Sequence, residues 1–112
     1  MIVVIFEVYP HAHGKADYLA VAAELRALLL QADGLISAER FESLSEQGKL
    51  LSLSFWRDEA AVANWRNELM HRQAQQRGRA SLFSHYRIRV GEIGRDYSID
   101  QRAQAPEDRD HS

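Results

Sequence analysis

The segment at residues 2–6 constrains the fold more than any other part of the chain. It reads Ile-Val-Val-Ile-Phe, so β-branched or aromatic residues occupy the odd and the even positions alike. Because successive side chains of a strand point to opposite faces, this run predicts a central strand that is covered on both sides. The pattern becomes amphipathic only at Glu7, and Pro10 ends the strand.

The remaining segments alternate between helical and strand periodicity, with turn residues between them. Apolar residues recur at i, i+3 and i+4 spacing in the helical segments and at every second position in the strands. The predicted elements are a helix over 15–31 that Asp33 and Gly34 end, a strand over 35–45 with a bulge at 40–41, a hairpin turn at 45–48, a strand over 49–56, a helix from the N-cap Asp58 to Gly78, a short turn at 80–83, and a last strand over 84–97 with a flexible point at Gly91 or Gly94.

This order, β-α-β-β-α-β, predicts an α+β ferredoxin-like sandwich in which the last strand lies antiparallel beside the first. Both helices then cover one face of the sheet, so a second subunit must cover the other. We expect an obligate homodimer with the final strand as an exchange element. The domain spans residues 1–97, and the polar tail at residues 98–112 is predicted to be disordered.

Composition excludes several classes of protein. A chain of 112 residues supports one domain, and a net charge of −2 disfavours a nucleic-acid partner. The absence of cysteine excludes disulfides and thiolate chemistry. The longest apolar run, residues 19–30, is interrupted by Glu24 and Arg26, and residues 1–6 lack the flanks of a signal peptide. We expect a soluble, cytoplasmic protein without a membrane partner.

Several spaced motifs carry a family resemblance. They are Ser-Leu-Ser-Phe-Trp-Arg-Asp-Glu-Ala at 52–60, Trp-Arg at 65–66, His-Arg-Gln-Ala-Gln at 71–75, Gly-Arg at 78–79, Phe-Ser-His-Tyr-Arg-Ile-Arg-Val at 83–90 and Arg-Asp-Tyr at 95–97. Over residues 1–97 the chain resembles the antibiotic biosynthesis monooxygenase (ABM) domain family, in its heme-degrading monooxygenase-like branch. The resemblance implies a dimeric α+β barrel with a pocket between sheet and helices in each subunit.

The resemblance also implies site residues. Heme-degrading relatives use a first-strand asparagine, a second-helix tryptophan and an iron-ligating histidine about ten residues later. Here these positions hold Glu7, Trp65 and a residue at or near Gln75, with His71 one turn earlier. Cofactor-free relatives carry a polar aromatic residue at about the spacing of His71. We expect no tightly bound cofactor, and heme, with His71 as its ligand, is the alternative.

The predicted catalytic residues are Trp65, which would wall the pocket, and His71, which would accept a proton. Trp65 could equally be a core residue, and His71 a surface residue near the end of its helix. On a straight helix the two positions lie about 120° apart, so a shared pocket requires a helix break near 67–68.

Four further residues are predicted to bind substrate: Glu7, Arg87, Trp56 and Phe83. Glu7 interrupts an apolar strand, and its cross-strand neighbour should be Arg87 or Arg89, as a structural pair or as a substrate ligand. No metal site is predicted, because the alternating histidines of the loop at 11–14 lack further ligands.

These observations favour a small monooxygenase that acts on a flat aromatic, polyketide- or quinol-like substrate. The alternatives are a heme-binding or heme-degrading monooxygenase and a non-catalytic, stress-associated dimer that binds a small aromatic ligand.

Overall fold

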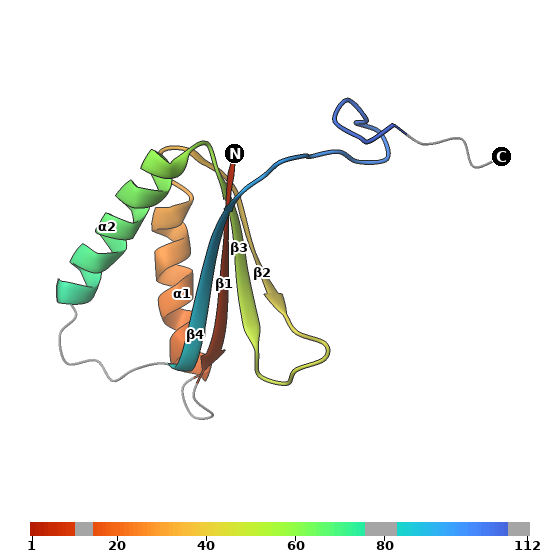
Figure 1. Ribbon diagram of the computed structural model, residues 1–112. Coiled ribbons are helices and arrows are strands. Elements are labelled where there is room, and N and C mark those ends of the chain that lie inside the picture. Colours follow the sequence, from red (N-terminus) through yellow and green to blue (C-terminus); the bar gives the residue numbers. More distant parts are fainter. Residues whose placement is uncertain (11–14, 76–82, 108–112) are drawn as a thin grey trace.

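The computed structural model describes residues 1–10, 15–75 and 83–107, without the side chains of residues 15, 17, 18, 21, 70–75, 83 and 84. Its elements follow the predicted order (Figure 1). They are β1 (Ile2–Pro10), α1 (Lys15–Leu29), β2 (Leu35–Glu42), β3 (Leu50–Trp56), α2 (Glu59–Gln75) and β4 (Phe83–Glu92).

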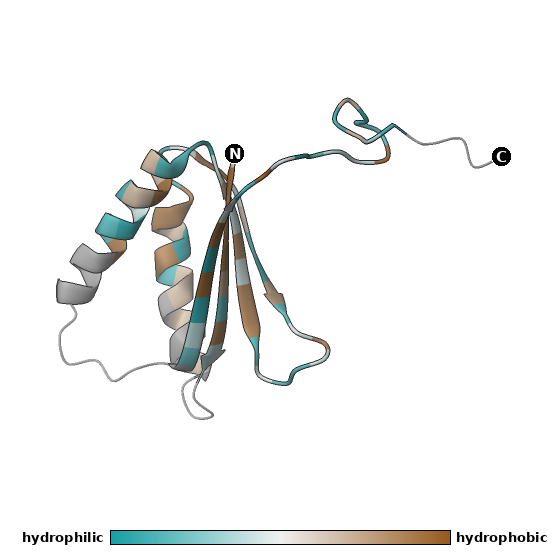
Figure 2. Ribbon diagram, in the orientation of Figure 1, coloured by the Kyte–Doolittle hydropathy of each residue, from teal (hydrophilic) through white to brown (hydrophobic). Residues whose placement is uncertain are grey.

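The four strands form one antiparallel sheet in the order β2-β3-β1-β4, with both helices on the same side (Figure 1). β1 lies inside the sheet, where Ile2 faces Trp56 of β3 on one side and Glu92 of β4 on the other. Figure 2 shows hydrophobic residues along β1 and β3, the two inner strands. The predicted ferredoxin-like α+β fold is therefore confirmed.

Several predicted boundaries were wrong. α1 ends at Leu29, and β2 ends at Glu42. The register of β2 shifts between Leu35 and Ser37, whereas residues 40–41 pair regularly. β4 ends at Glu92, five residues before the predicted end, because β1 begins at Ile2 and offers no further partner.

The core lies between the sheet and the N-terminal half of α2. Ile2, Trp56 and Ala61 are buried together, and partly buried apolar side chains pack against them: Val4, Leu29, Ala32, Leu35, Val62 and Trp65. Since the pairing is regular, the even-numbered residues of β1 and β3 face the helices. The indole N–H of Trp56 donates to Ser54 Oγ at 2.8 Å, which satisfies both polar groups inside the core.

The odd-numbered residues form what we call the open face, the side of the sheet away from the helices. Its inner strands present Val3, Ile5 and Glu7 of β1 beside Leu51, Leu53 and Phe55 of β3. No helix or strand within the described ranges covers this face (Figure 1). β1 is thus apolar on both sides, as predicted, but helices of the same chain cover only one of these sides.

The turn between α1 and β2 fixes the start of α2. Gly34 has a φ of +86°, a conformation that glycine adopts without strain, and a Cβ at this position would lie 2.5 Å from the Cβ of Ala61. The N–H of Arg57 donates to the carbonyl oxygen of Gly34 at 2.7 Å, and the Arg57 guanidinium binds Asp33 at 3.0 Å. Asp58 Oδ1 accepts a hydrogen bond from the N–H of Ala61 at 2.9 Å, so Asp58 is the N-cap of α2, as predicted.

The chain beyond β4 has local turns and, up to residue 107, neither helix nor strand. Among the described residues, no helix is both long and apolar enough to cross a lipid bilayer.

Candidate functional site

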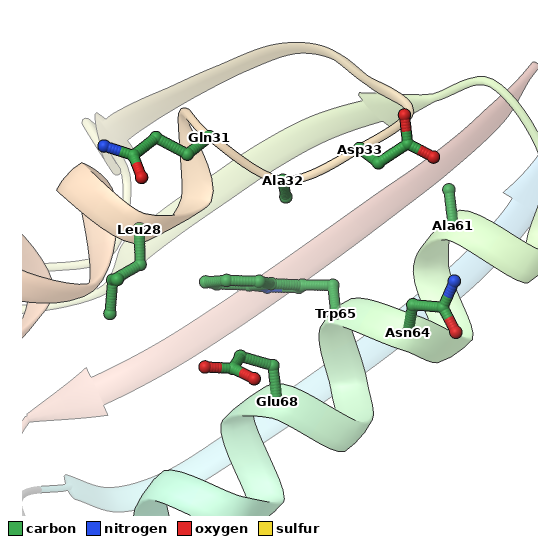
Figure 3. A pocket seen from close by; sticks show the side chains of 8 residues that line it. All are labelled: Leu28, Gln31, Ala32, Asp33, Ala61, Asn64, Trp65 and Glu68. Atoms are coloured by element: carbon green, nitrogen blue, oxygen red, sulfur yellow. The ribbon is translucent and has the colours of Figure 1, made fainter.

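A pocket of about 250 Å³ lies between the end of α1 and the first half of α2. The α1 side contributes Leu28, Gln31, Ala32 and Asp33, and α2 contributes Ala61, Asn64, Trp65 and Glu68 (Figure 3). In this view the indole of Trp65 extends across the pocket toward Leu28. Glu68 lies on one side of the ring plane, and Gln31, Ala32 and Asp33 lie on the other.

Trp65 packs against the core. Its ring centroid lies 6.4 Å from that of Trp56, with 31° between the ring planes. Trp56 is only 1% exposed and its indole N–H is bonded to Ser54, so it forms a rigid base for Trp65. The half-buried Trp65 therefore contributes to the core and to the pocket wall at once.

The polar groups of the pocket come from both helices. Asn64 and Glu68 are four residues apart and share a face of α2. On the α1 side, Asp33 forms an ion pair with Arg57. The Arg57 guanidinium holds the pKa of the Asp33 carboxyl below its usual value, and the carboxylate raises the pKa of Arg57. The pocket thus combines an aromatic wall with amide and carboxylate groups that accept hydrogen bonds.

Trp65 was predicted from the sequence, but the polar residues beside it were not. The i, i+4 spacing of Asn64 and Glu68 around Trp65 was visible in the sequence and could have indicated a common face. The contribution of Gln31 and Asp33 had no such signal, since it depends on how the end of α1 meets α2.

His71 lies within α2, but its side chain is outside the described part of the structure, as is that of Phe83 at the start of β4. The helix break that would bring positions 65 and 71 to one side is absent, because α2 is continuous from Glu59 to Gln75. On a regular helix these two positions lie about 120° apart.

Glu7 lies on the open face in a network of charged groups. Its Oε1 accepts from Arg89 Nη1 at 2.7 Å, and its Oε2 lies 3.2 Å from Lys49 Nζ. The hydrogen bond from Lys49, and then the positive charges of Lys49 and Arg89, hold the pKa of Glu7 below its usual value. Lys49 also approaches Glu46 at 3.5 Å.

Arg87 is the Cα partner of Glu7, as the predicted register requires, but the ion pair goes to Arg89. The sheet separates Glu7 and Arg87 from Trp65 and Trp56, which lie on the helix side. Within one chain, the residues predicted to bind substrate therefore lie on opposite faces of the sheet and do not form one site. A substrate-binding role for Glu7 and Arg87 stays a prediction that this geometry does not support.

The described lining of the pocket offers no ligand for heme iron. Heme iron is held by His, Cys, Met or Tyr side chains, and none of the eight pocket-lining residues is of these types. The described ranges contain no group of three His, Cys, Asp or Glu residues that could hold a metal ion. The histidines at positions 11 and 13 lie outside the described residues.

Fold and site together define a small ferredoxin-like α+β protein with a ligand-sized pocket beside a tryptophan of its second helix. The sequence profile described as antibiotic biosynthesis monooxygenase matches residues 1–77. The chain belongs to this family, which confirms the resemblance seen in its motifs.

Jasmonate monooxygenase ABM from Pyricularia oryzae is 43% identical over 93 residues, which cover 83% of this chain and 43% of that protein. The chain thus spans less than half the length of this relative.

Two solved structures share the fold. A mutant of MhuD with two manganese protoporphyrin IX molecules per active site has a TM-score of 0.72 and 11% identity, over 88% of this chain and 99% of that chain. A mutant of SnoaB, a cofactor-independent oxygenase from Streptomyces nogalater, has a TM-score of 0.67 and 13% identity, over 85% of this chain and 94% of that chain.

Proposed function

We propose that the chain is a monooxygenase that oxidises a small, flat, electron-rich aromatic molecule of quinol or polyketide type without a tightly bound cofactor. The observation that carries the proposal is the pocket walled by Trp65 in a chain of this family. A volume of about 250 Å³ lies below the range of about 300–1,000 Å³ for drug-sized ligands, so it suits a molecule of one or two fused rings.

The reaction needs little from the protein beyond binding and a base. For a phenol with a free para position, loss of the O–H proton gives an anion that reduces dioxygen. One oxygen atom becomes the new para carbonyl of a quinone, and the other leaves as water with the hydrogens of the former O–H and C–H bonds. All electrons come from the substrate, so the protein supplies orientation, exclusion of water and proton acceptance.

Two side chains are candidates for the proton acceptor. Histidine is the residue type whose charge changes nearest neutral pH, which makes His71 one candidate, and Glu68, which lines the pocket beside Trp65, is the other. His71→Ala and Glu68→Gln separate these roles, because only the true acceptor should shift the pH profile of kcat while leaving the fold intact.

A second substrate class follows from the 43% identity to a jasmonate monooxygenase. Hydroxylation of a C–H bond takes one oxygen atom from dioxygen and forms water from the other, and it requires two electrons from an added reductant. Hydroxylation is therefore distinguished from quinone formation by its dependence on a reductant such as ascorbate.

We also propose that two copies pair through the open face. Val3, Ile5, Leu51, Leu53 and Phe55 present apolar surface there without a covering layer in the described ranges. A two-fold pair would bury this surface in both copies at once.

The test is oxygen uptake by the purified chain with 1,5-dihydroxynaphthalene, a phenol with a free para position, and separately with jasmonate with and without ascorbate. We expect quinone formation without reductant and a loss of at least about tenfold in kcat/KM for Trp65→Ala, a change of about 1.4 kcal/mol or more in transition-state binding. The matched control for Glu68→Gln is Glu24→Gln, an exposed position of α1 outside the pocket.

Saturable hemin binding without turnover of these substrates would instead support the heme alternative. Binding of the aromatic compounds without oxygen uptake would support the non-catalytic dimer.

A further inference from the structure

The described lining of the pocket beside Trp65 is rich in hydrogen-bond acceptors and contains no Lys, Arg or His. Its side chains that end in an amide or a carboxylate are Gln31, Asp33, Asn64 and Glu68. Amides donate as well as accept hydrogen bonds, whereas ionised carboxylates only accept them. The polar part of this lining is therefore suited to a ligand that donates hydrogen bonds from O–H or N–H groups.

The two carboxylate-bearing residues flank the aromatic wall of the pocket. Glu68 lies on one side of the Trp65 ring plane and Asp33 lies on the other (Figure 3). The hydrogen bond from Arg57 lowers the pKa of the Asp33 carboxyl, so this group stays ionised at neutral pH. An ionised carboxylate has about four lone-pair sites, so it can accept a ligand donor beside its existing contacts. A flat ring stacked on either side of the indole would thus lie near a hydrogen-bond acceptor.

The guanidinium of Arg57, next to the pocket, is already bound to carboxylates. Its Nη2 and Nη1 donate to Asp33 at 3.0 Å and 3.4 Å, and its Nε donates to Asp58 at 3.2 Å. All three nitrogen atoms are therefore engaged, and Arg57 does not itself line the pocket. A ligand carboxylate beside Trp65 would lose water without gaining a cationic partner from the described lining, and it would lie near like charges. Both effects oppose its binding.

We propose that this pocket selects its substrate by charge, and that it accepts neutral or cationic aromatic molecules with O–H or N–H donors and discriminates against aromatic carboxylates. The inference rests on the proposed function and narrows its substrate class. Transfer of a proton from a neutral phenol to a pocket carboxylate leaves the total charge unchanged, so the selection is compatible with the proposed reaction. For the second substrate class, the same selection favours the methyl ester of jasmonate over the jasmonate anion.

Calorimetric titration with three naphthalenes of similar size tests this selection without any turnover. At pH 7 the probes are neutral 2-naphthylmethanol, cationic 2-naphthylmethylammonium and anionic 2-naphthoate. We expect the Kd of the naphthoate to be at least about fivefold higher than that of the alcohol, and the ammonium compound to bind at least as tightly as the alcohol. Two unit charges about 4 Å apart in water change a binding constant about fivefold, so one nearby carboxylate suffices for this difference.

Three variants assign the selection to the pocket. Glu68→Gln removes one negative charge with little change of shape, and it should reduce the ratio of the naphthoate and alcohol Kd values at least about twofold. Glu24→Gln makes the same change at an exposed position of α1 outside the pocket, and it should leave this ratio unchanged. Trp65→Ala should weaken the binding of all three compounds, because it removes the aromatic wall.

Equal Kd values for the alcohol and the naphthoate, or tighter binding of the naphthoate, would overturn the inference. An equal effect of Glu68→Gln and Glu24→Gln, or no binding of any of the three compounds, would overturn it too. None of these titrations involves dioxygen, so oxygen uptake with 1,5-dihydroxynaphthalene tests the proposed reaction separately. The expected order of affinities in a chain that takes up no oxygen would refute the reaction and support the selection by charge.

Discussion

Replacing Gly34 by alanine should destabilise the protein through two separable effects. The first is the backbone conformation, because a φ of +86° costs an L-residue about 1–2 kcal/mol. The second is a clash, since the new Cβ would lie 2.5 Å from the Cβ of Ala61, whereas carbon atoms pack at about 3.5–4.0 Å. The α1–β2 turn and α2 would have to separate by about 1 Å, and such overpacking costs about 1–3 kcal/mol.

Gly48 provides a matched control. Its φ is +81°, close to that of Gly34, but nothing lies within 4 Å of a Cβ built there. Gly48→Ala should therefore cost only the backbone part, about 1–2 kcal/mol, against about 2–5 kcal/mol for Gly34→Ala. Urea denaturation followed by tryptophan fluorescence measures both, since Trp56 is buried in the core. Equal losses for the two variants would refute the close contact between the turn and α2.

Three further changes test other parts of the structure. Ser54→Ala leaves the buried indole N–H of Trp56 without its acceptor and should cost about 1–3 kcal/mol in denaturation, and Ser54→Thr, which keeps an acceptor, should cost less if the added methyl group fits. Because the pKa of Glu7 is lowered in the folded state, its stabilising effect is present at neutral pH and is lost as the pH falls below about 4.3. The stability difference between wild type and Glu7→Gln should thus shrink on acidification, and a constant difference would contradict the assigned ion pairs. Asp58→Ala should lower the Tm by several degrees and Asp58→Asn by less, because asparagine also caps helices.

Element order and strand faces could be predicted from the sequence because they depend on local periodicity. The two apolar faces of residues 2–6 and the alternation along residues 50–56 fixed which side chains share a face of the sheet. The end of β4 could not be predicted in the same way. Residues 93–97 resemble a strand continuation by themselves, but pairing stops where β1 begins.

The candidate site was predictable only in part. Trp65 was identified from its family motif, whereas the pocket around it depends on the meeting of the α1 end with α2, which no local pattern encodes. The cross-strand register of Glu7 was correct, but its carboxylate binds the diagonal Arg89 and Lys49 instead of Arg87. Long side chains also reach diagonal neighbours, so the register alone does not decide the ion pair.

The most direct test of the proposed monooxygenase is a single-turnover reaction under isotopically labelled dioxygen, with metal-free purified protein and 1,5-dihydroxynaphthalene, whose para position is free. We expect a quinone that carries one labelled oxygen atom, formed without added reductant and at least about tenfold more slowly by the Trp65→Ala variant. A product without label, or turnover that Trp65→Ala leaves unchanged, would contradict the proposed reaction.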